Sequence, residues 1–255
     1  MGDAVTLEVR GRVAILAIDK PKMNQLSGEV FETMRKQLDV VEADKNVLAV
    51  IITGTGEKAF SAGADLASGF GDFSKVDFLK RGQDVWNKVE YFSKPVIAAI
   101  NGHALGGGCE LAMACHIRFM KKGATIGLTE TNLGIMAGYG GSLRLPRLVG
   151  KAKALEMMFL GKKIGAEEAL AIGLVDHMSE GNVLDDALEL ANQIAKRPPL
   201  AITALTKLCN ISQNITPDMH LKIEREELGR LFVSKDAAEG ISAFFGKKEP
   251  NFKGE

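Results

Sequence analysis

The middle of the chain reads Asn101-Gly102-His103-Ala104-Leu105-Gly106-Gly107-Gly108-Cys109-Glu110-Leu111-Ala112 and directly follows an apolar run, Val96 to Ile100. Three consecutive glycines lack Cβ atoms, so the backbone here can approach a ligand closely. The apolar residues that follow predict a helix from Cys109 to Cys115, with Glu110 in its first turn. The first N–H groups of a helix have no internal partner and can stabilise a developing oxyanion. Taken alone, Glu110 is equally well explained as a complement to the helix dipole.

Strands and helices alternate on both sides of this segment, which predicts an α/β architecture. Before it we expect a pair of strands at Val5–Arg10 and Val13–Asp19, followed by a helix at 28–43 that Ser27 caps. A strand at Leu48–Thr53, a helix at Lys75–Phe92 and a strand at Val96–Ile100 come next. Helices dominate the last third, at Ala166–Ile172, Val183–Lys196, Leu200–Ile211 and Pro217–Phe232, and Pro198-Pro199 interrupts them. We therefore expect an α/β core carrying the active site in residues 1–196 and a helical region in 197–255.

Composition excludes several classes of function. The chain has 255 residues, with 32 basic and 32 acidic side chains, so its zero net charge gives no reason to expect binding to nucleic acid or to a membrane surface. The most apolar stretch, Pro95 to Cys115, contains Asn101, His103 and Glu110, which argues against a membrane span. Three cysteines and an N-terminus unlike a signal or transit peptide favour a reducing, cytoplasmic location. The spacing of the three cysteines does not predict a metal site.

Two further glycine-rich segments and a second acid are candidates for chemistry. The segments are Phe60 to Asp65 and Gly134 to Gly141, and each on its own is better explained as a tight turn. Glu130 lies between apolar residues near these turns and is either a solvated loop carboxylate or, with Glu110, half of a general acid/base pair. We interpret Cys109 as a packing residue rather than a nucleophile because its neighbours are apolar. The chain contains none of the motifs G-x-S-x-G, G-x-x-x-x-G-K-[ST] and G-x-G-x-x-G.

At these segments the sequence resembles the crotonase (enoyl-CoA hydratase/isomerase) superfamily. The similar stretches span nearly the whole chain in family order: Ala59–Asp65, Asn101–Ala112, Gly138–Gly141 with Arg144–Gly150, Ala166–Ala169 with Gly173–Asp176, and Lys247–Phe252. The resemblance implies a crotonase-like spiral of ββα units followed by C-terminal helices that build a homotrimer or a dimer of trimers.

The resemblance also implies roles for individual residues. The backbone N–H groups of Ala64 and Gly107 would form an oxyanion hole for a thioester enolate. Glu110 and Glu130 would hold a water molecule and act as the two hydratase carboxylates, and the N–H of Gly138 would help to position that water.

Substrate contacts are implied at further positions. The segment from Lys20 to Leu26 would cradle the CoA adenine, and Lys247 would reach a CoA phosphate of a neighbouring subunit. The full set of expected substrate-binding residues is Lys20, Asn24, Gln25, Leu26, Ala62, Asp65, Leu66, Phe70, Tyr139 and Lys247. Ala137, Ser142-Leu143 and Gln25 depart from the usual family residues, which leaves the shape of the acyl pocket open.

The leading hypothesis is an enoyl-CoA hydratase that adds water across the C2=C3 bond of a 2-enoyl-CoA without a cofactor, since coenzyme A belongs to the substrate. The alternatives on the same fold are a Δ3,Δ2-enoyl-CoA isomerase relying on Glu130 and a hydratase of a cyclic dienoyl-CoA. A non-catalytic protein that binds acyl-CoA or RNA is the alternative from another class. The expected partners are therefore the acyl-CoA substrate and further copies of the chain, with no nucleic acid and no membrane.

Overall fold

Two sheets organise the protein. The computed structural model describes residues 3–20, 22–66 and 74–255. The larger sheet has the order β1-β2-β3-β5-β7-β10, formed by Val5–Arg10, Val13–Ile18, Ala49–Gly54, Val96–Ile100, Ile117–Lys121 and His177–Ser179. The smaller sheet has the order β4-β6-β8-β9, formed by Ala59–Ser61, His103–Leu105, Thr125–Gly127 and Ile164–Gly165. In the larger sheet β1 and β2 are antiparallel, and every later neighbour is parallel.

The chain alternates between the sheets in a repeating strand–strand–helix pattern. β3, β5 and β7 lie side by side in the larger sheet, and each is followed by one short strand, β4, β6 or β8, of the smaller sheet. The helices α2 (Lys75–Glu90) and α3 (Gly107–Ala114) close the first two repeats, and the 3₁₀ turn η1 (Glu130–Leu133) and α4 (Gly141–Val149) follow the third. This arrangement confirms the expected α/β spiral of ββα units.

The spiral brings separate loops to one place. β4, β6 and β8 are parallel neighbours, so their carboxyl ends lie at the same edge of the smaller sheet. The residues that follow these strands are 62–66, 106–110 and 128–130. Ligand sites of parallel sheets form at this kind of edge, and all three segments contain predicted site residues.

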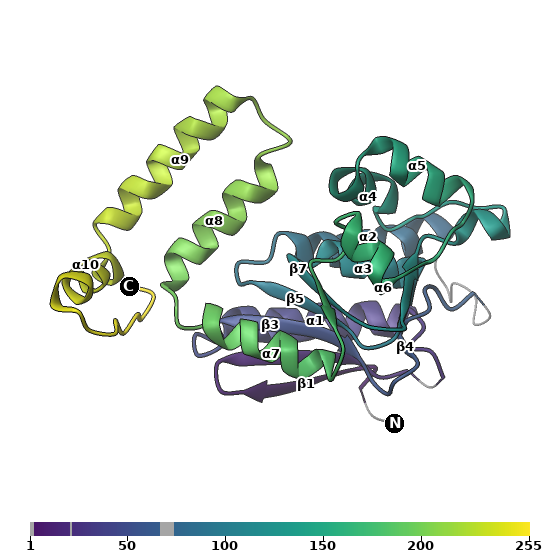
Figure 1. Ribbon diagram of the computed structural model, residues 1–255, viewed down its shortest axis with the longest axis horizontal. Helices are drawn as coiled ribbons and strands as arrows, with labels where there is room; N and C mark the ends of the chain where they lie inside the picture. The colour runs from purple at the N-terminus through teal and green to yellow at the C-terminus, as the bar shows by residue number, and fades with distance from the viewer. Residues whose placement is uncertain (1–2, 21, 67–73) are drawn as a thin grey trace.

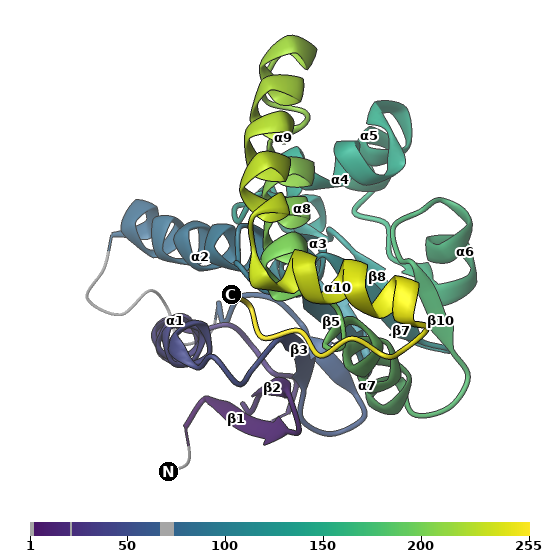
Figure 2. The same cartoon turned by 90° about the vertical axis from the view of Figure 1, so that its left-hand side faces the viewer.

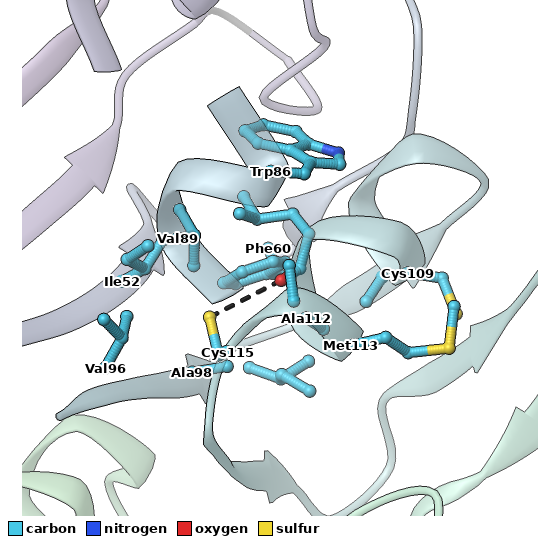
Figure 3. Close-up of a cluster of buried hydrophobic side chains, with 14 of the residues drawn as sticks. Ile52, Phe60, Trp86, Val89, Val96, Ala98, Cys109, Ala112, Met113 and Cys115 are labelled. Carbon is cyan, nitrogen blue, oxygen red and sulfur yellow. Dashed lines mark hydrogen bonds between the residues drawn. The ribbon is translucent and has the colours of Figure 1, made fainter. Parts of the chain in front are cut away.

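Side chains on the two faces of the larger sheet pack into two different clusters, because successive residues of a strand point to opposite faces. Val50 and Ile52 join the cluster under α1 (Gly28–Ala43), α2 and α3, whereas Ala49 and Ile51 face α7 (Val183–Ile194). Figure 3 shows part of the first cluster, in which Trp86, Phe60 and Cys115 pack together. Cys109 and Cys115 are both buried and unpaired, which confirms the interpretation of Cys109 as a packing residue.

Most predicted element boundaries agree with the structure to within two residues. α1 covers 28–43 as expected, and the Ser27 hydroxyl accepts a hydrogen bond from the N–H of Val30 at its start. The prediction was wrong for α3, which begins at Gly107 rather than at Cys109. Glycine disfavours helix in isolation, but here the N–H of Glu110 bonds to the carbonyl of Gly106 and the first turn closes on the glycines.

Helices dominate the C-terminal half, which also contributes β9 and β10 to the sheets. After α4 come α5 (Lys151–Phe159), α6 (Ala166–Ala171) and α7, then α8 (Pro199–Ile211), α9 (Pro217–Phe232) and α10 (Lys235–Gly246). The sequence patterns did not predict α4, α5 or α10. Figures 1 and 2 show α9 extending away from the sheets, and none of its residues is buried. In the described ranges no helix is both long and apolar enough to span a bilayer.

Candidate active site

A cavity of about 710 Å³ opens at the edge where the smaller-sheet strands end. Its polar lining comes from the three loops described above, from Lys75 and Gln83 on α2, from Ser142 and from the backbone of Gly138 and Gly140. Its apolar lining comes from α2, from η1 and the segment after it, and from the residues after β4, namely Leu79, Leu133, Ile135, Met136, Ala137, Tyr139, Ala62, Ala64 and Leu66. A small polar centre inside a mainly apolar wall is the usual form of a site for a small organic ligand.

Two backbone N–H groups are available in this cavity. Ala64 follows β4, and Gly107 is the first residue of α3, so the Gly107 N–H has no partner within its helix. Within the described part of the chain, neither N–H donates a hydrogen bond. Both residues line the cavity. The oxyanion hole that the family resemblance implies at these two positions stays a prediction.

Glu110 projects from the first turn of α3 and is 1% exposed. Its Oε1 accepts hydrogen bonds from the N–H groups of Tyr139 and Gly141, both at 2.7 Å. Burial raises the pKa of Glu110 to about 7, and the nearby Glu130 adds to the rise, whereas the two N–H groups and Arg144 oppose it. Its Oε2 is buried and finds no hydrogen-bond partner among the described residues, so this oxygen is free to act on a ligand.

Glu130 approaches from the other side, as the first residue of η1. Burial raises its pKa as well, and its Oε2 is also buried without a hydrogen-bond partner in the described ranges. The backbone at Gly106 makes room for it: this residue has φ +54°, and a Cβ there would lie 3.0 Å from Glu130 Oε1. The cavity therefore contains two carboxyl groups with raised pKa values, each with an unused buried oxygen.

Most of the predicted site residues meet at this cavity. Its lining includes Ala62, Ala64, Leu66, Gly107, Glu110, Glu130, Gly138 and Tyr139. The Tyr139 ring is 4% exposed and packs edge-on against Phe31 and Trp86. Its position shows that Tyr139 forms a wall of the cavity through an aromatic cluster. Burial raises the pKa of its phenol, and the two glutamates add to the rise.

The segment from Lys20 to Leu26 lies beside the cavity rather than in its lining. The N–H of Leu26 bonds to the carbonyl of Gly63, and the N–H of Asp65 bonds to the carbonyl of Leu26. Asn24 is buried, and its Nδ2 donates to the carbonyls of Thr55 and Ala59. Its side chain therefore supports the segment. The Lys20 ammonium pairs with Glu29, and Gln25 is half-buried.

Two predicted residues lie elsewhere. Lys247 caps the end of α10, which Figure 1 shows at the opposite side of the molecule from α4. Within one copy of the chain it is thus separated from the cavity. Phe70 falls outside the described residues.

Two functional contacts were not foreseen from the sequence. The Gln83 amide on α2 donates to the carbonyl of Gly138 at 2.8 Å, and Arg144 on α4 donates to the carbonyl of Tyr139 at 2.8 Å. Gln83 carried no sequence signal, because it is an exposed polar residue in an amphipathic helix. Arg144 lies in a stretch similar to the crotonase family, but the stretch alone assigned it no role.

Comparison with known proteins agrees with this geometry. A family model described as enoyl-CoA hydratase/isomerase matches residues 8–255. A probable enoyl-CoA hydratase of Bacillus subtilis (strain 168) is 43% identical over 258 residues, which cover 99% of this chain and 100% of the relative. The chain belongs to the enoyl-CoA hydratase/isomerase family.

Other members of the enoyl-CoA hydratase/isomerase family match along their whole length. A short-chain-enoyl-CoA hydratase of Clostridium acetobutylicum is 40% identical, covering 96% of this chain and 95% of the relative. The crystal structure of an enoyl-CoA hydratase from Bacillus anthracis has a TM-score of 0.95 at 35% identity, covering 99% of this chain and 100% of that one. The resemblance seen in the sequence is therefore confirmed for the family and for its fold.

Proposed function

We propose that the protein is an enoyl-CoA hydratase, which adds water reversibly across the C2=C3 bond of a 2-enoyl-CoA. One observation carries the proposal: two carboxyl groups with unused buried oxygens line the same cavity as two unpaired backbone N–H groups. An isomerase needs only one acid for proton transfer, whereas hydration uses both, one at the attacking water and one at the carbon that gains a proton. The names of the relatives support the same reaction.

The reaction follows from these positions. The thioester oxygen accepts hydrogen bonds from the N–H groups of Ala64 and Gly107, which stabilise the enolate. Glu110 and Glu130 hold a water molecule, aided by the N–H of Gly138. One carboxylate takes a proton from the water as its oxygen bonds to C3, and the C2=C3 electron pair moves into the enolate. The other group, in its acid form, delivers a proton to C2, which completes the addition. No cofactor enters these steps, and coenzyme A belongs to the substrate.

The remaining predicted contacts divide the substrate into two parts. The acyl chain lies along the apolar wall, with Ala62, Leu66 and Tyr139 among its neighbours. Phe70, which is outside the described residues, remains an expected substrate contact. The CoA moiety lies toward Asp65 and the segment containing Lys20, Asn24, Gln25 and Leu26, which runs beside the oxyanion loop. Asn24 contributes by shaping that segment, since its side chain is occupied by backbone carbonyls. Lys247 of one subunit binds a phosphate of the CoA that is held by a neighbouring subunit.

The proposal includes self-association through residues 197–255, with residues 1–196 as the catalytic core. α9 and α10 expose large apolar side chains, namely Met219, Leu221, Leu228, Phe232, Ile241, Phe244 and Phe245. α9 buries none of its residues, and exposed apolar side chains at helical spacing are typical of a surface that packs against a partner. We assign that partner to further copies of this chain, in a trimer or a dimer of trimers. The unpaired cysteines suit a cytoplasmic protein.

The test follows the absorbance of the conjugated thioester of crotonyl-CoA. The wild-type protein should remove this absorbance, and Glu130→Gln should slow the loss by about 10² to 10⁴-fold, the usual contribution of one general acid or base. Glu110→Gln should cause a loss of similar size. If Glu110→Gln leaves turnover of a 3-enoyl-CoA unaffected while the wild type fails to hydrate crotonyl-CoA and longer 2-enoyl-CoAs, the protein is an isomerase and the proposal is wrong.

A further inference from the structure

The turn from Gly138 to Gly141 is held by side chains at three successive peptide groups. In the first peptide, Gln83 binds the carbonyl of Gly138, and Glu110 binds the N–H of Tyr139. In the third, Glu110 binds the N–H of Gly141. The middle peptide joins Tyr139 to Gly140 and makes no contact with Glu110. Its carbonyl is bound by Arg144 Nη1 at 2.8 Å.

Arg144 is itself held on its other edge. It is 3% exposed, and its Nε and Nη2 both donate to Glu90 Oε2 on α2, at 2.9 and 2.6 Å. Its Nη2 also donates to the Asn87 amide oxygen at 2.7 Å. The planar guanidinium has donors in fixed directions, so these contacts on α2 determine where Nη1 points.

Gly140 allows the guanidinium to come this close. Its φ is +103°, and a Cβ at this residue would lie 2.2 Å from Arg144 Nη1. Any larger residue would therefore displace the arginine from the turn. Gly140 leaves room for the buried arginine, and the contacts with α2 hold the arginine in place.

We propose that Arg144 is a positioning residue that fixes the middle peptide of this turn, so that the N–H groups of Tyr139 and Gly141 both point at Glu110 Oε1. The inference rests on the proposed function, because it concerns the orientation of a carboxyl group in that reaction. Rotation of the middle peptide changes the direction of the peptides on both sides of it. Without Arg144, Glu110 loses its alignment, and its unused Oε2 no longer faces the reacting atoms.

The first experiment separates the geometry of Arg144 from its charge. Arg144→Met removes both, whereas Arg144→Lys keeps a positive charge but cannot reach Glu90, Asn87 and Tyr139 together. Both variants should lose about 10- to 100-fold in kcat with KM changed less than about twofold, because misplacement of a catalytic group affects the chemical step. Arg147→Met is the matched control. Arg147 lies on the same helix, 4.0 Å from Glu90, but its hydrogen bond goes to Asn214. The kcat of Arg147→Met should therefore stay at the wild-type value.

The pH profile is a readout that a merely structural role would not change. Arg144 lowers the pKa of Glu110, whereas Glu130 raises it. The N–H groups of Tyr139 and Gly141 also lower this pKa, and both variants misalign them. The limb of the kcat profile that Glu110 controls should therefore move to higher pH in Arg144→Lys, and further in Arg144→Met, which also loses the charge. A wild-type kcat in Arg144→Lys, or equal losses in kcat for Arg144→Met and Arg147→Met, would overturn the proposal.

A measurement without substrate keeps this inference separate from the proposed reaction. The Glu110 carboxyl can be followed by ¹³C NMR in protein with labelled glutamate and assigned with Glu110→Gln. Its titration should move to higher pH in Arg144→Met even if the wild type proves inactive on every enoyl-CoA, and no movement would overturn the inference. If Arg144→Met does not fold, Asn87→Ala replaces it, since Asn87 is exposed. This variant should lower kcat a few-fold, and an unchanged kcat would count against the proposal.

Discussion

At the scale of single residues, Glu110 and Glu130 share a cavity but are held differently. Two backbone N–H groups bind one oxygen of Glu110, which favours its ionised form, yet burial is the larger influence and raises its pKa to about 7. Glu130 is half-buried, and burial also dominates its raised pKa. Glu110 can therefore change protonation state near neutral pH, and burial favours the acid form of Glu130 as well. Reversible proton transfer requires groups of this kind.

The raised pKa of Glu110 predicts a pH-dependent change in stability. The folded protein holds this proton up to about pH 7, whereas the ordinary pKa of a glutamate side chain is 4.5. The folded state therefore binds more protons between these values, so its stability is greatest below the lower pKa and falls as the pH rises through the higher one. Glu110→Gln removes this dependence.

Urea unfolding at pH 5 and pH 8 checks this prediction. Between the two values the wild type should lose on the order of 2 kcal/mol more than Glu110→Gln. A comparison between these pH values cancels any constant cost of the buried amide. Equal pH dependence in the two proteins would show that Glu110 has an ordinary pKa in the folded state.

At the scale of elements, the entry to α3 combines a backbone requirement with a steric one. Gly106 has φ +54°, and a Cβ there would meet Glu130 Oε1 at 3.0 Å. Gly11, in the β1–β2 turn, has a similar φ of +61° but nothing within 4 Å of an added Cβ. Substitution of either glycine would strain the backbone because φ is positive at both, but only Gly106 adjoins the cavity.

Gly106→Ala and Gly11→Ala therefore form a matched pair. Each should destabilise the fold through its positive φ, Gly11→Ala by about 1 to 2 kcal/mol. Gly106→Ala should cost more, because φ +54° with ψ −124° lies outside the left-handed helical region. Only Gly106→Ala should also lower kcat, by roughly 10²-fold, because Glu130 must shift away from the added methyl group. Thermal unfolding and the crotonyl-CoA assay measured together test both statements. Similar kcat values for the two variants would contradict the steric argument.

Elements with strong local signals were predictable from sequence. Ser27 marks the start of α1, and Pro217 marks that of α9, and both helices have the expected bounds. α3 was predicted two residues late, because glycines rarely begin a helix unless the surrounding fold holds them there. α4 was missed for a similar reason: it begins after Gly140 and includes Pro146, and both residue types argue against helix locally.

The site was predictable only where a contact depends on nearby residues or on family resemblance. The positions of Glu110 and Glu130 beside glycine-containing turns made them candidates, resemblance implied their roles, and the structure places both on one cavity. The contacts of Arg144 could not be predicted, because Glu90 and Arg144 are 54 residues apart, and nothing local links them. Such contacts arise because α2 and α4 both pack against α3, which no periodicity encodes.

At the scale of the whole molecule, the apolar surface of α9 predicts assembly. Leu221, Leu228 and Phe232 recur at helical spacing, and all are at least 48% exposed. Phe232→Glu should weaken the assembly, because it places a charge where a neighbouring copy would pack. Val9→Glu is the control: Val9 is 49% exposed but lies on β1, in the catalytic core.

Light scattering after size-exclusion chromatography measures the outcome. The wild type and Val9→Glu should have the mass of three or six chains, and Phe232→Glu a smaller mass. A monomeric wild type would exclude this form of self-association and would also remove the role proposed for Lys247. The catalytic assay then shows whether one copy of the chain suffices for turnover.

The spiral of ββα units has a consequence for how the chemistry can change. Each repeat delivers one part of the site: the loop after β4 carries one N–H donor, the loop after β6 carries the other with Glu110, and the segment after β8 carries Glu130. These parts lie in different repeats and join only at the cavity. Replacing the residues after β8 would exchange one acid and leave both oxyanion donors in place. The residues for different reaction steps therefore belong to different repeats. A change in a single repeat can alter one step and produce a new activity.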